Sequence, residues 1–352
     1  MNPYDRIMTL LRGAKDKIDR LPVFCSARTY NLHAMEVFDA YWPEAHRDPL
    51  KMAKLASGLH KLTGNENISV PFDMTVEAEA LGAPIDYFYG LVRWPNVKRF
   101  TVQHPVDIKY PSEPSASGRI PVICEAIKIL KKEFEGKVPI MAILTCPFTS
   151  IGSYLVEPAQ FFKWLVINPE KVNEFYEQSI PTYAAFANAF KEAGADVIIL
   201  AEEAASLDNV SPQHFNKIIG PNLTKLIRVI PPPRILHVCG QLVDPQRPNI
   251  ELLSNLLRCG AEAVTIGETT PMRQAVEIKN KTKPNCLIGG NVSSLEVIHK
   301  GPVDRIKEAV KNAIDEGTDM VCSSCDYWLE TPTEHIRAFV EYAIEYQNSL
   351  ER

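Results

Sequence analysis

Residues 138–146 read VPIMAILTC, and this short apolar run is the first of six that recur along the rest of the chain. A longer stretch with apolar residues at helical spacing separates each run from the next. This alternation predicts strand–helix units that form a parallel sheet. The other five runs are residues 196–203 (DVIILAEE), 234–240 (RILHVCG), 261–267 (AEAVTIG), 286–291 (CLIGGN) and 319–325 (DMVCSSC).

Helices are predicted between and after these runs, and several of them end in a glycine just before the next strand, which is typical of a helix C-cap. Gly194, Gly260 and Gly317 are such stops. The predicted helices cover residues 170–194, 211–229, 250–260, 271–280, 303–317 and 331–347.

The first third of the chain is less regular, but it continues the same alternation of strands and helices. We expect strands at residues 21–26 and 68–72 and helices near residues 4–12 and 48–63. The two early strands bring the count to eight, which predicts an α/β TIM (β/α)8 barrel with an N-terminal helical extension. Residues 110–120 have the composition of a loop, so we expect residues 1–352 to form one domain.

The composition is that of an ordinary globular protein and excludes some classes of function. The 352 residues are 45% hydrophobic and 23% charged, with a formal net charge of -5. Such a charge, without a run of basic residues, argues against a nucleic-acid partner. Residues 1–20 carry charges throughout, and no apolar stretch reaches membrane-spanning length, so we expect a cytoplasmic protein without a membrane partner.

His237, Cys239 and Cys325 are the candidate metal ligands. Residues two apart on a strand project to the same face, so His237 and Cys239 can reach one ion. Cys325 follows another strand, and active sites of this barrel lie where the strands end. Three protein ligands leave a position open for substrate, as in a catalytic zinc site. The alternative is a hydrogen-bonded strand histidine with two buried packing cysteines.

The other cysteines are expected to be structural. Eight cysteines spread over a chain of this length, in a reducing compartment, are thiols or metal ligands. Cys322 should face the other side of its strand from Cys325, and Cys286 begins its strand at the wrong end of the barrel. Core packing is the expectation for these two and for Cys25, Cys124, Cys146 and Cys259.

Polar residues near the same strand ends are candidates for supporting roles. Glu268 is expected either as a fourth ligand that leaves when substrate arrives or as an exposed acid near a helix start. Glu202 or Glu203 is expected to orient the imidazole of His237. Asn291 ends another strand at the same mouth. Aromatic residues are expected to line a pocket for a flat ligand or to belong to the core and rim: Tyr87, Phe88, Tyr89, Trp94, Tyr327 and Trp328.

The donor set indicates a particular chemistry. A zinc ion held by one imidazole and two thiolates is soft and carries little residual positive charge. Such a site suits holding a substrate thiol as a nucleophilic thiolate, because metal binding lowers the thiol pKa. Alkylation of sulfur by a methyl donor is the reaction that we expect.

Five segments resemble the uroporphyrinogen decarboxylase superfamily, and within it the branch of methylcobamide:coenzyme M methyltransferases and related corrinoid-dependent methyltransferases. The resemblance implies a TIM barrel, a zinc ion bound by His237, Cys239 and Cys325, and methyl transfer between a corrinoid cofactor on a separate protein and a small molecule at the zinc. The segments are PFDMTVEAEALG (71–82), WPEAHRDPLKMAKLA (42–56), HVCG (237–240), GGN (289–291) and CDYWLETPTEHIRAF (325–339).

From their places at the strand ends and beside Cys325, we assign Glu268 and Glu203 to catalysis and Asn291 and Tyr327 to cofactor binding. The chain lacks a cobalt-ligating DxHxxG motif, so the cobalamin is expected on a partner corrinoid protein. The resemblance also implies that the partner docks over the barrel mouth.

Two departures from the coenzyme M branch leave the small substrate open. Ser324 stands where that branch usually has glycine, and residues 26–30 (SARTY) differ from its usual pattern. The substrate is either an acceptor thiol such as coenzyme M or a methoxylated aromatic or other methylated donor that methylates cob(I)amide. A third alternative is a decarboxylase, but such an enzyme is expected to carry several arginines in its N-terminal loop, where only Arg28 stands.

Overall fold

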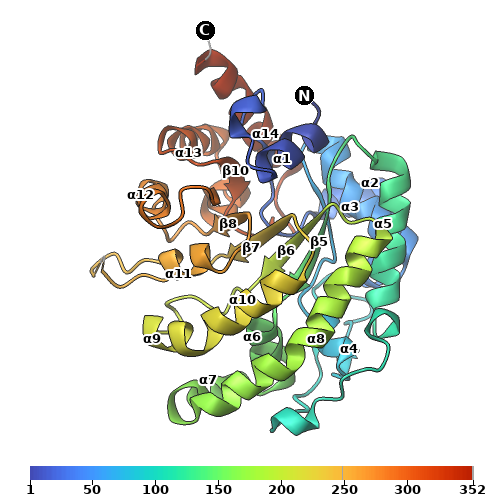
Figure 1. Cartoon of the computed structure of the whole chain (residues 1–352). Helices are drawn as coiled ribbons and strands as arrows, with labels where there is room; N and C mark the ends of the chain where they lie inside the picture. Colours follow the sequence, from blue (N-terminus) through green and yellow to red (C-terminus); the bar gives the residue numbers. More distant parts are fainter. Residues whose placement is uncertain (248, 351–352) are drawn as a thin grey trace.

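The computed structural model describes residues 1–247 and 249–350, and its centre is an eight-stranded sheet (Figure 1). Every neighbouring pair of strands in this sheet is parallel. The strands are β1 (Val23–Phe24), β2 (Ile68–Val70), β5 (Ile140–Thr145), β6 (Val197–Ala201), β7 (Arg234–Val238), β8 (Ala263–Ile266), β9 (Leu287–Val292) and β10 (Met320–Ser323).

The strand order confirms the predicted TIM-type barrel. From β2 to β10 the strands lie side by side in chain order, and β10 then pairs with β1. The last strand of the chain thus returns to the first, which curls the sheet. The eight predicted strands are the eight observed ones, and the assignment of residues 1–352 to one domain remains a prediction.

Side chains close the sheet between β1 and β2, where the described residues form no strand ladder. Glu66 N donates to Val23 O at 3.0 Å, and the Glu66 carboxylate accepts from Val23 N at 2.8 Å. Asn65 Oδ1 accepts from Cys25 N at 3.1 Å, and Asn67 Nδ2 donates to Cys25 O at 3.0 Å. These amide and carboxylate groups satisfy backbone groups that a neighbouring strand would otherwise pair. We call this junction the β1–β2 seam.

Alternate strand residues fill the inside of the barrel, and helix α1 (Pro3–Leu11) closes one end of it. Asn2 caps this helix by accepting from Asp5 N at 2.8 Å, and a proline occupies its first turn. The inner cluster comprises Ile7, Met8, Leu10 and Leu11 of α1 together with Phe24, Met141, Ile143, Val197, Ile199, Ala201, Ile235, Ala263, Leu287, Met320 and Cys322.

The remaining long helices surround the sheet (Figure 1), as expected for strand–helix units. No helix of the described ranges combines the length and apolar character needed to cross a lipid bilayer. The helices are α2 (Leu32–Phe38), α3 (Pro49–Thr63), α4 (Val76–Ala80), α5 (Ile120–Phe134), α6 (Pro147–Ser150), α7 (Pro158–Ile167), α8 (Pro169–Ala193), α9 (Pro212–His214), α10 (Gly220–Val229), α11 (Leu253–Arg258), α12 (Met272–Thr282), α13 (Val303–Asp315) and α14 (Thr333–Leu350).

Several local features differ from the expectation, among them helices α5 and α7, which were not predicted. The predicted helix at residues 211–229 is interrupted by a widened turn at Phe215–Ile219, because Pro221 lacks the N–H that would continue the hydrogen-bond ladder. A short antiparallel hairpin of β3 (Ile85–Asp86) and β4 (Asn96–Val97) was not anticipated from the sequence. Two-residue strands are too short to leave a periodic pattern.

The β1–β2 seam generates a prediction about stability. Asn65→Ala should lower the free energy of unfolding by about 3 kcal/mol, because it leaves the buried Cys25 N–H and the Tyr327 hydroxyl without their acceptor. Urea titration followed by circular dichroism measures this change. The exposed hairpin residue Asn96 provides the control, and equal stability losses for Asn65→Ala and Asn96→Ala would contradict the role of the seam.

Candidate metal centre

His237 and Cys239 reach the mouth of the barrel from the same side of β7. Ile235 belongs to the inner cluster, whereas Leu236 and Val238 pack in the outer core, so His237 lies on the inner face. Cys239 directly follows Val238, the last residue of the strand. It lies two residues after His237, so the alternation of the strand directs both side chains to the same face. The prediction that these two residues share one face is confirmed.

Cys325 reaches the same place from a loop after β10. The strand ends at Ser323, and alternation along it directs Cys322 into the barrel interior. After the strand, Ser294 holds the turn: its hydroxyl accepts from Cys325 N at 3.1 Å and donates to Cys325 O at 3.0 Å. Ser323 Oγ donates to the same carbonyl at 2.8 Å. These bonds to its backbone position Cys325, which lies beyond the strand.

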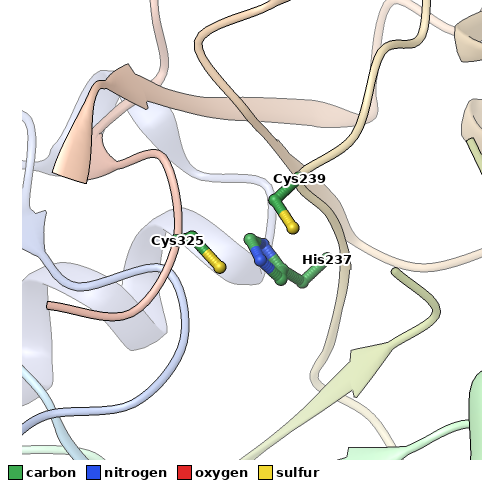
Figure 2. Close-up of side chains that lie close together, drawn as sticks. All are labelled: His237, Cys239 and Cys325. Carbon is green, nitrogen blue, oxygen red and sulfur yellow. The ribbon is translucent and has the colours of Figure 1, made fainter. Parts of the chain in front are cut away.

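The three predicted ligands come together, as Figure 2 shows, with both sulfurs near the imidazole. One donor atom from each of His237, Cys239 and Cys325 lies within 4.8 Å of the other two. Two sulfurs bound to one zinc ion stand about 3.8 Å apart, given a zinc–sulfur bond of about 2.3 Å in a tetrahedral arrangement. The group therefore could hold a metal ion with only small side-chain shifts.

Thr265 orients the imidazole of His237. It lies opposite His237 in the register of β7 and β8, and its hydroxyl is 2.9 Å from His237 Nδ1. Nε2 is buried and has no hydrogen-bond partner within the described parts of the chain. Burial, with a smaller effect of the Arg28 charge, lowers the pKa of His237 to about 3, so the ring is neutral and Nε2 is available as a metal ligand.

The two thiols also favour a cation between them. The pKa of Cys325 is raised well above its usual value, first by the hydrogen bond with Cys239 and then by burial. The acids Asp326 and Glu203 raise it further. A coordinated cation has the opposite effect, because a ligating thiol is deprotonated. An unpaired buried nitrogen and two close thiols are thus groups that a soft divalent metal would satisfy together.

Gly267 allows a close approach of two strand ends at this site. A Cβ at this position would overlap the carbonyl oxygen of Cys239 and would lie 2.8 Å from its carbonyl carbon. Only glycine lets the chain after β8 pass so near the backbone of Cys239.

A cavity of about 300 Å³ adjoins the metal ligands. Cys239, Cys325 and Glu268 line it, and Glu268 also accepts from Ser293 Oγ at 3.0 Å. Tyr327 lines it as well, but its ring is buried and its hydroxyl donates to Asn65 Oδ1 at 3.0 Å. The remaining lining residues are Trp94, Ser294, Leu295, Ser324, Asp326 and Trp328.

The expected carboxylate partner of His237 is corrected to Thr265. Glu202 is buried and instead accepts from Thr149 N at 2.7 Å and Tyr176 OH at 2.8 Å, and burial raises its pKa to about 7. Glu203 lies 3.4 Å from Arg28 Nη1. Thr265 was missed, because its pairing with His237 depends on the register between β7 and β8.

Asn291 lies near the carboxyl end of β9, beside Cys322 in the register of β9 and β10. Its side-chain amide donates to Thr270 O at 2.7 Å. The roles assigned to Glu268, Glu203, Asn291 and Tyr327 remain predictions.

The packing role of the other cysteines is confirmed. All eight cysteines are free thiols in the structure. Cys322 belongs to the inner cluster, and Cys286 is buried against Ala261 O. Cys25, Cys146 and Cys259 are buried, and Cys124 is half-buried against the outer core.

Comparison with known proteins places these features in a wider group. A model of the family described as uroporphyrinogen decarboxylase (URO-D) matches residues 2–346. The methylcobamide:CoM methyltransferase MtaA of Methanosarcina barkeri is 32% identical and covers 97% of each chain. The methylcobamide:CoM methyltransferase MtbA of Methanosarcina acetivorans is 30% identical and covers 98% of each chain. A solved methyltransferase from Methanosarcina mazei superposes with a TM-score of 0.89 at 32% identity, over 98% of this chain and 99% of that one.

Single replacement of His237, Cys239 or Cys325 by alanine should strongly reduce bound zinc, because each change removes one of three protein donors. The unchanged protein should retain about one zinc ion per chain after dialysis, as measured by inductively coupled plasma mass spectrometry. The buried Cys322→Ser variant serves as the control and should keep its zinc. Loss of zinc in that control alone would mean that the wrong cysteine was chosen.

Thr265→Val should weaken zinc binding by about 10- to 100-fold, because the nearly isosteric side chain cannot hold Nδ1 of His237. Competition with a chromogenic chelator measures the affinity. The exposed neighbour Thr269 provides the matched control as Thr269→Val. Equal affinities for the two variants would show that Thr265 does not support the ligand.

Proposed function

The chain belongs to the uroporphyrinogen decarboxylase family, and from this we propose that it is a zinc-dependent methyltransferase of the methylcobamide:coenzyme M type. It moves a methyl group between a corrinoid on a partner protein and a small thiol such as coenzyme M. The observation that carries the proposal is the convergence of the His237 imidazole and the thiols of Cys239 and Cys325 within 4.8 Å. Full-length relatives named as methylcobamide:CoM methyltransferases support it.

His237 Nε2 and the sulfurs of Cys239 and Cys325 are the proposed zinc ligands. Bound zinc supplies one kind of chemistry, which is to lower the pKa of a substrate thiol and keep it as a thiolate. Thr265 keeps Nε2 directed at the ligand group, and the backbone bonds of Ser294 keep Cys325 in place. With three protein donors, a bound zinc ion would keep one position for the substrate sulfur.

The cavity of about 300 Å³ beside the ligands is the proposed place of the acceptor thiol. Trp94 and Trp328 border it and would limit the access of water to the reacting sulfur. Glu268 is proposed to occupy the open ligand position until a thiol displaces it, and Glu203 is proposed as a second catalytic acid.

During transfer the sulfur electron pair forms the new sulfur–carbon bond. A methylcorrinoid on the partner would supply the methyl group and keep the electron pair of the broken cobalt–carbon bond, and the thiol would release its proton. The corrinoid must therefore approach the cavity from the open mouth, where we propose that Asn291 and Tyr327 contact it. Positioning of the donor carbon in line with the sulfur accounts for much of the rate gain in such reactions.

A second candidate is a demethylase component that takes a methyl group from a methoxylated aromatic or other methylated compound to cob(I)amide. A cavity of about 360 Å³ lined by Trp42, Trp94, Tyr154 and Trp328 favours it, because aromatic walls suit a flat ring. Trp94 and Trp328 also line the cavity beside the metal ligands, so the two cavities adjoin.

The zinc-loaded protein, mixed with free methylcobalamin and 2-mercaptoethanesulfonate, should produce the methyl thioether and demethylated cobalamin, because the metal site supplies the thiolate. Cobalamin absorbance and mass spectrometry of the thioether measure the reaction. Cys322→Ser should retain the activity, and Cys239→Ala should lose it.

A parallel reaction with methoxybenzene and cob(I)alamin tests the demethylase. Methylation of cob(I)alamin there, with no reaction of the thiol, would replace the first candidate by the second. Zinc-loaded protein that is inactive in both reactions would contradict the proposed function.

A further inference from the structure

Arg28 is a buried cation whose hydrogen-bonding capacity is only partly used. It lies in the loop after β1, and its side chain is 1% exposed. Nη1 is 3.3 Å from Asp326 and 3.4 Å from Glu203, which is longer than the usual 2.7–2.9 Å of a charge-assisted hydrogen bond. Nε and Nη2 are buried and lack any partner among residues 1–247 and 249–350.

An unsatisfied edge of this kind is unusual in a folded protein. A buried N–H group without an acceptor is costly, and the cost is larger when the group is charged. Nε and Nη2 carry parallel N–H groups, which match two oxygens of a carboxylate, sulfonate or phosphate. The free edge of Arg28 therefore has the geometry of an oxyanion receptor.

Arg28 lines a small cavity beside the metal site. The cavity measures about 90 Å³, which is about the volume of three water molecules and suits a compact head group. Trp94 and Asp326 line both this cavity and the one of about 300 Å³ beside Cys239 and Cys325, so the two spaces adjoin. The other lining residues of the small cavity are Phe72, Asp73, Met74, Pro95 and Tyr154.

The backbone places Arg28 close to the metal ligands. The Cys25 thiol approaches both Arg28 O, at 3.2 Å, and Cys325 O, at 3.5 Å. This contact joins the loop after β1 to the loop after β10, whose strands are neighbours in the sheet. A short molecule can thus reach both Arg28 and the ligand group.

The nearby acids have partners of their own. Asp73 accepts from Arg119 Nη1 at 2.7 Å and Nη2 at 3.0 Å, and its charge is thereby balanced. Asp326 accepts from the backbone N of Arg28 at 2.8 Å, and burial raises the pKa of Glu203, which disfavours its charged form. These acids contact Nη1 of Arg28, whereas Nε and Nη2 have no hydrogen-bond partner among the described residues.

We propose that Arg28 selects the acceptor by binding an oxyanion on the tail of the thiol, while the sulfur lies beside Cys239 and Cys325. The head group is a sulfonate or a carboxylate, and a neutral thiol lacks this contact. The inference rests on the proposed thiol methylation, which it makes more specific. Arg28 acts in it as a specificity-determining residue that touches the substrate away from the reacting sulfur.

A series of thiols tests the selection. The zinc-loaded protein should show a KM for 2-mercaptoethanesulfonate about tenfold or more below that for 2-mercaptoethanol, because the neutral alcohol lacks the charge-assisted hydrogen bond to Arg28. Homocysteine distinguishes a carboxylate beside an ammonium group from a simple sulfonate. Arg28→Lys, which keeps the charge but loses the planar pair of donors, should reduce the preference by about tenfold.

Arg99→Lys is the matched control, because Arg99 is exposed and lines none of the three cavities described above. It should keep the preference of the unchanged protein. Equal KM values for the charged and neutral thiols, or an unchanged preference in Arg28→Lys, would overturn the inference while leaving thiol methylation intact. Lack of reaction with every thiol would instead contradict the proposed function.

Binding of ethanesulfonate, which has no thiol, gives a readout that needs neither metal nor turnover. Calorimetric titration of the metal-free protein should detect its binding, and Arg28→Lys should weaken it by about tenfold. The unchanged protein alone decides the outcome if the variant does not fold. Absence of any ethanesulfonate binding to that protein would overturn the inference.

Discussion

Closure of the parallel sheet at the β1–β2 seam is the constraint on which the site depends. Parallel strands all end at the same side of a barrel, so side chains from distant parts of the chain meet only if the sheet curls back on itself. The side chains of Asn65, Glu66 and Asn67 replace a strand ladder at this junction. Asn65 also holds the hydroxyl of Tyr327, which ties the seam to the loop that carries Cys325.

The site joins two ends of opposite chemical character. At one end, a neutral imidazole and two thiols form a soft donor group that favours a divalent metal. At the other end, the free edge of Arg28 is a hard, positively charged group that favours oxygen ligands. Adjoining cavities connect them. A small molecule with a sulfur at one end and an oxyanion at the other would be held in one orientation.

The position of each ligand relative to its strand explains how far it could be predicted. His237 and Cys239 obey the two-residue alternation of β7, so the sequence identified both. Cys325 lies past the end of β10, where alternation no longer applies, and only its place near a strand end pointed to it. The hydrogen bond of Thr265 was missed because it depends on the register between β7 and β8, which no local pattern reveals.

The sequence by itself determined the order of the eight strands, the barrel and the pair of ligands on β7, because apolar periodicity and residue parity are local properties of the chain. Only the tertiary structure decided that Thr265 is the hydrogen-bond partner of His237 and that the Cys325 side chain lies beside His237 and Cys239. It also decided that Nε and Nη2 of Arg28 have no partner among the described residues. These depend on distances between segments up to three hundred residues apart, such as the loops after β1 and β10 that meet at Cys25. Packing of the closed sheet sets such distances, and the order of residues along one strand does not encode them.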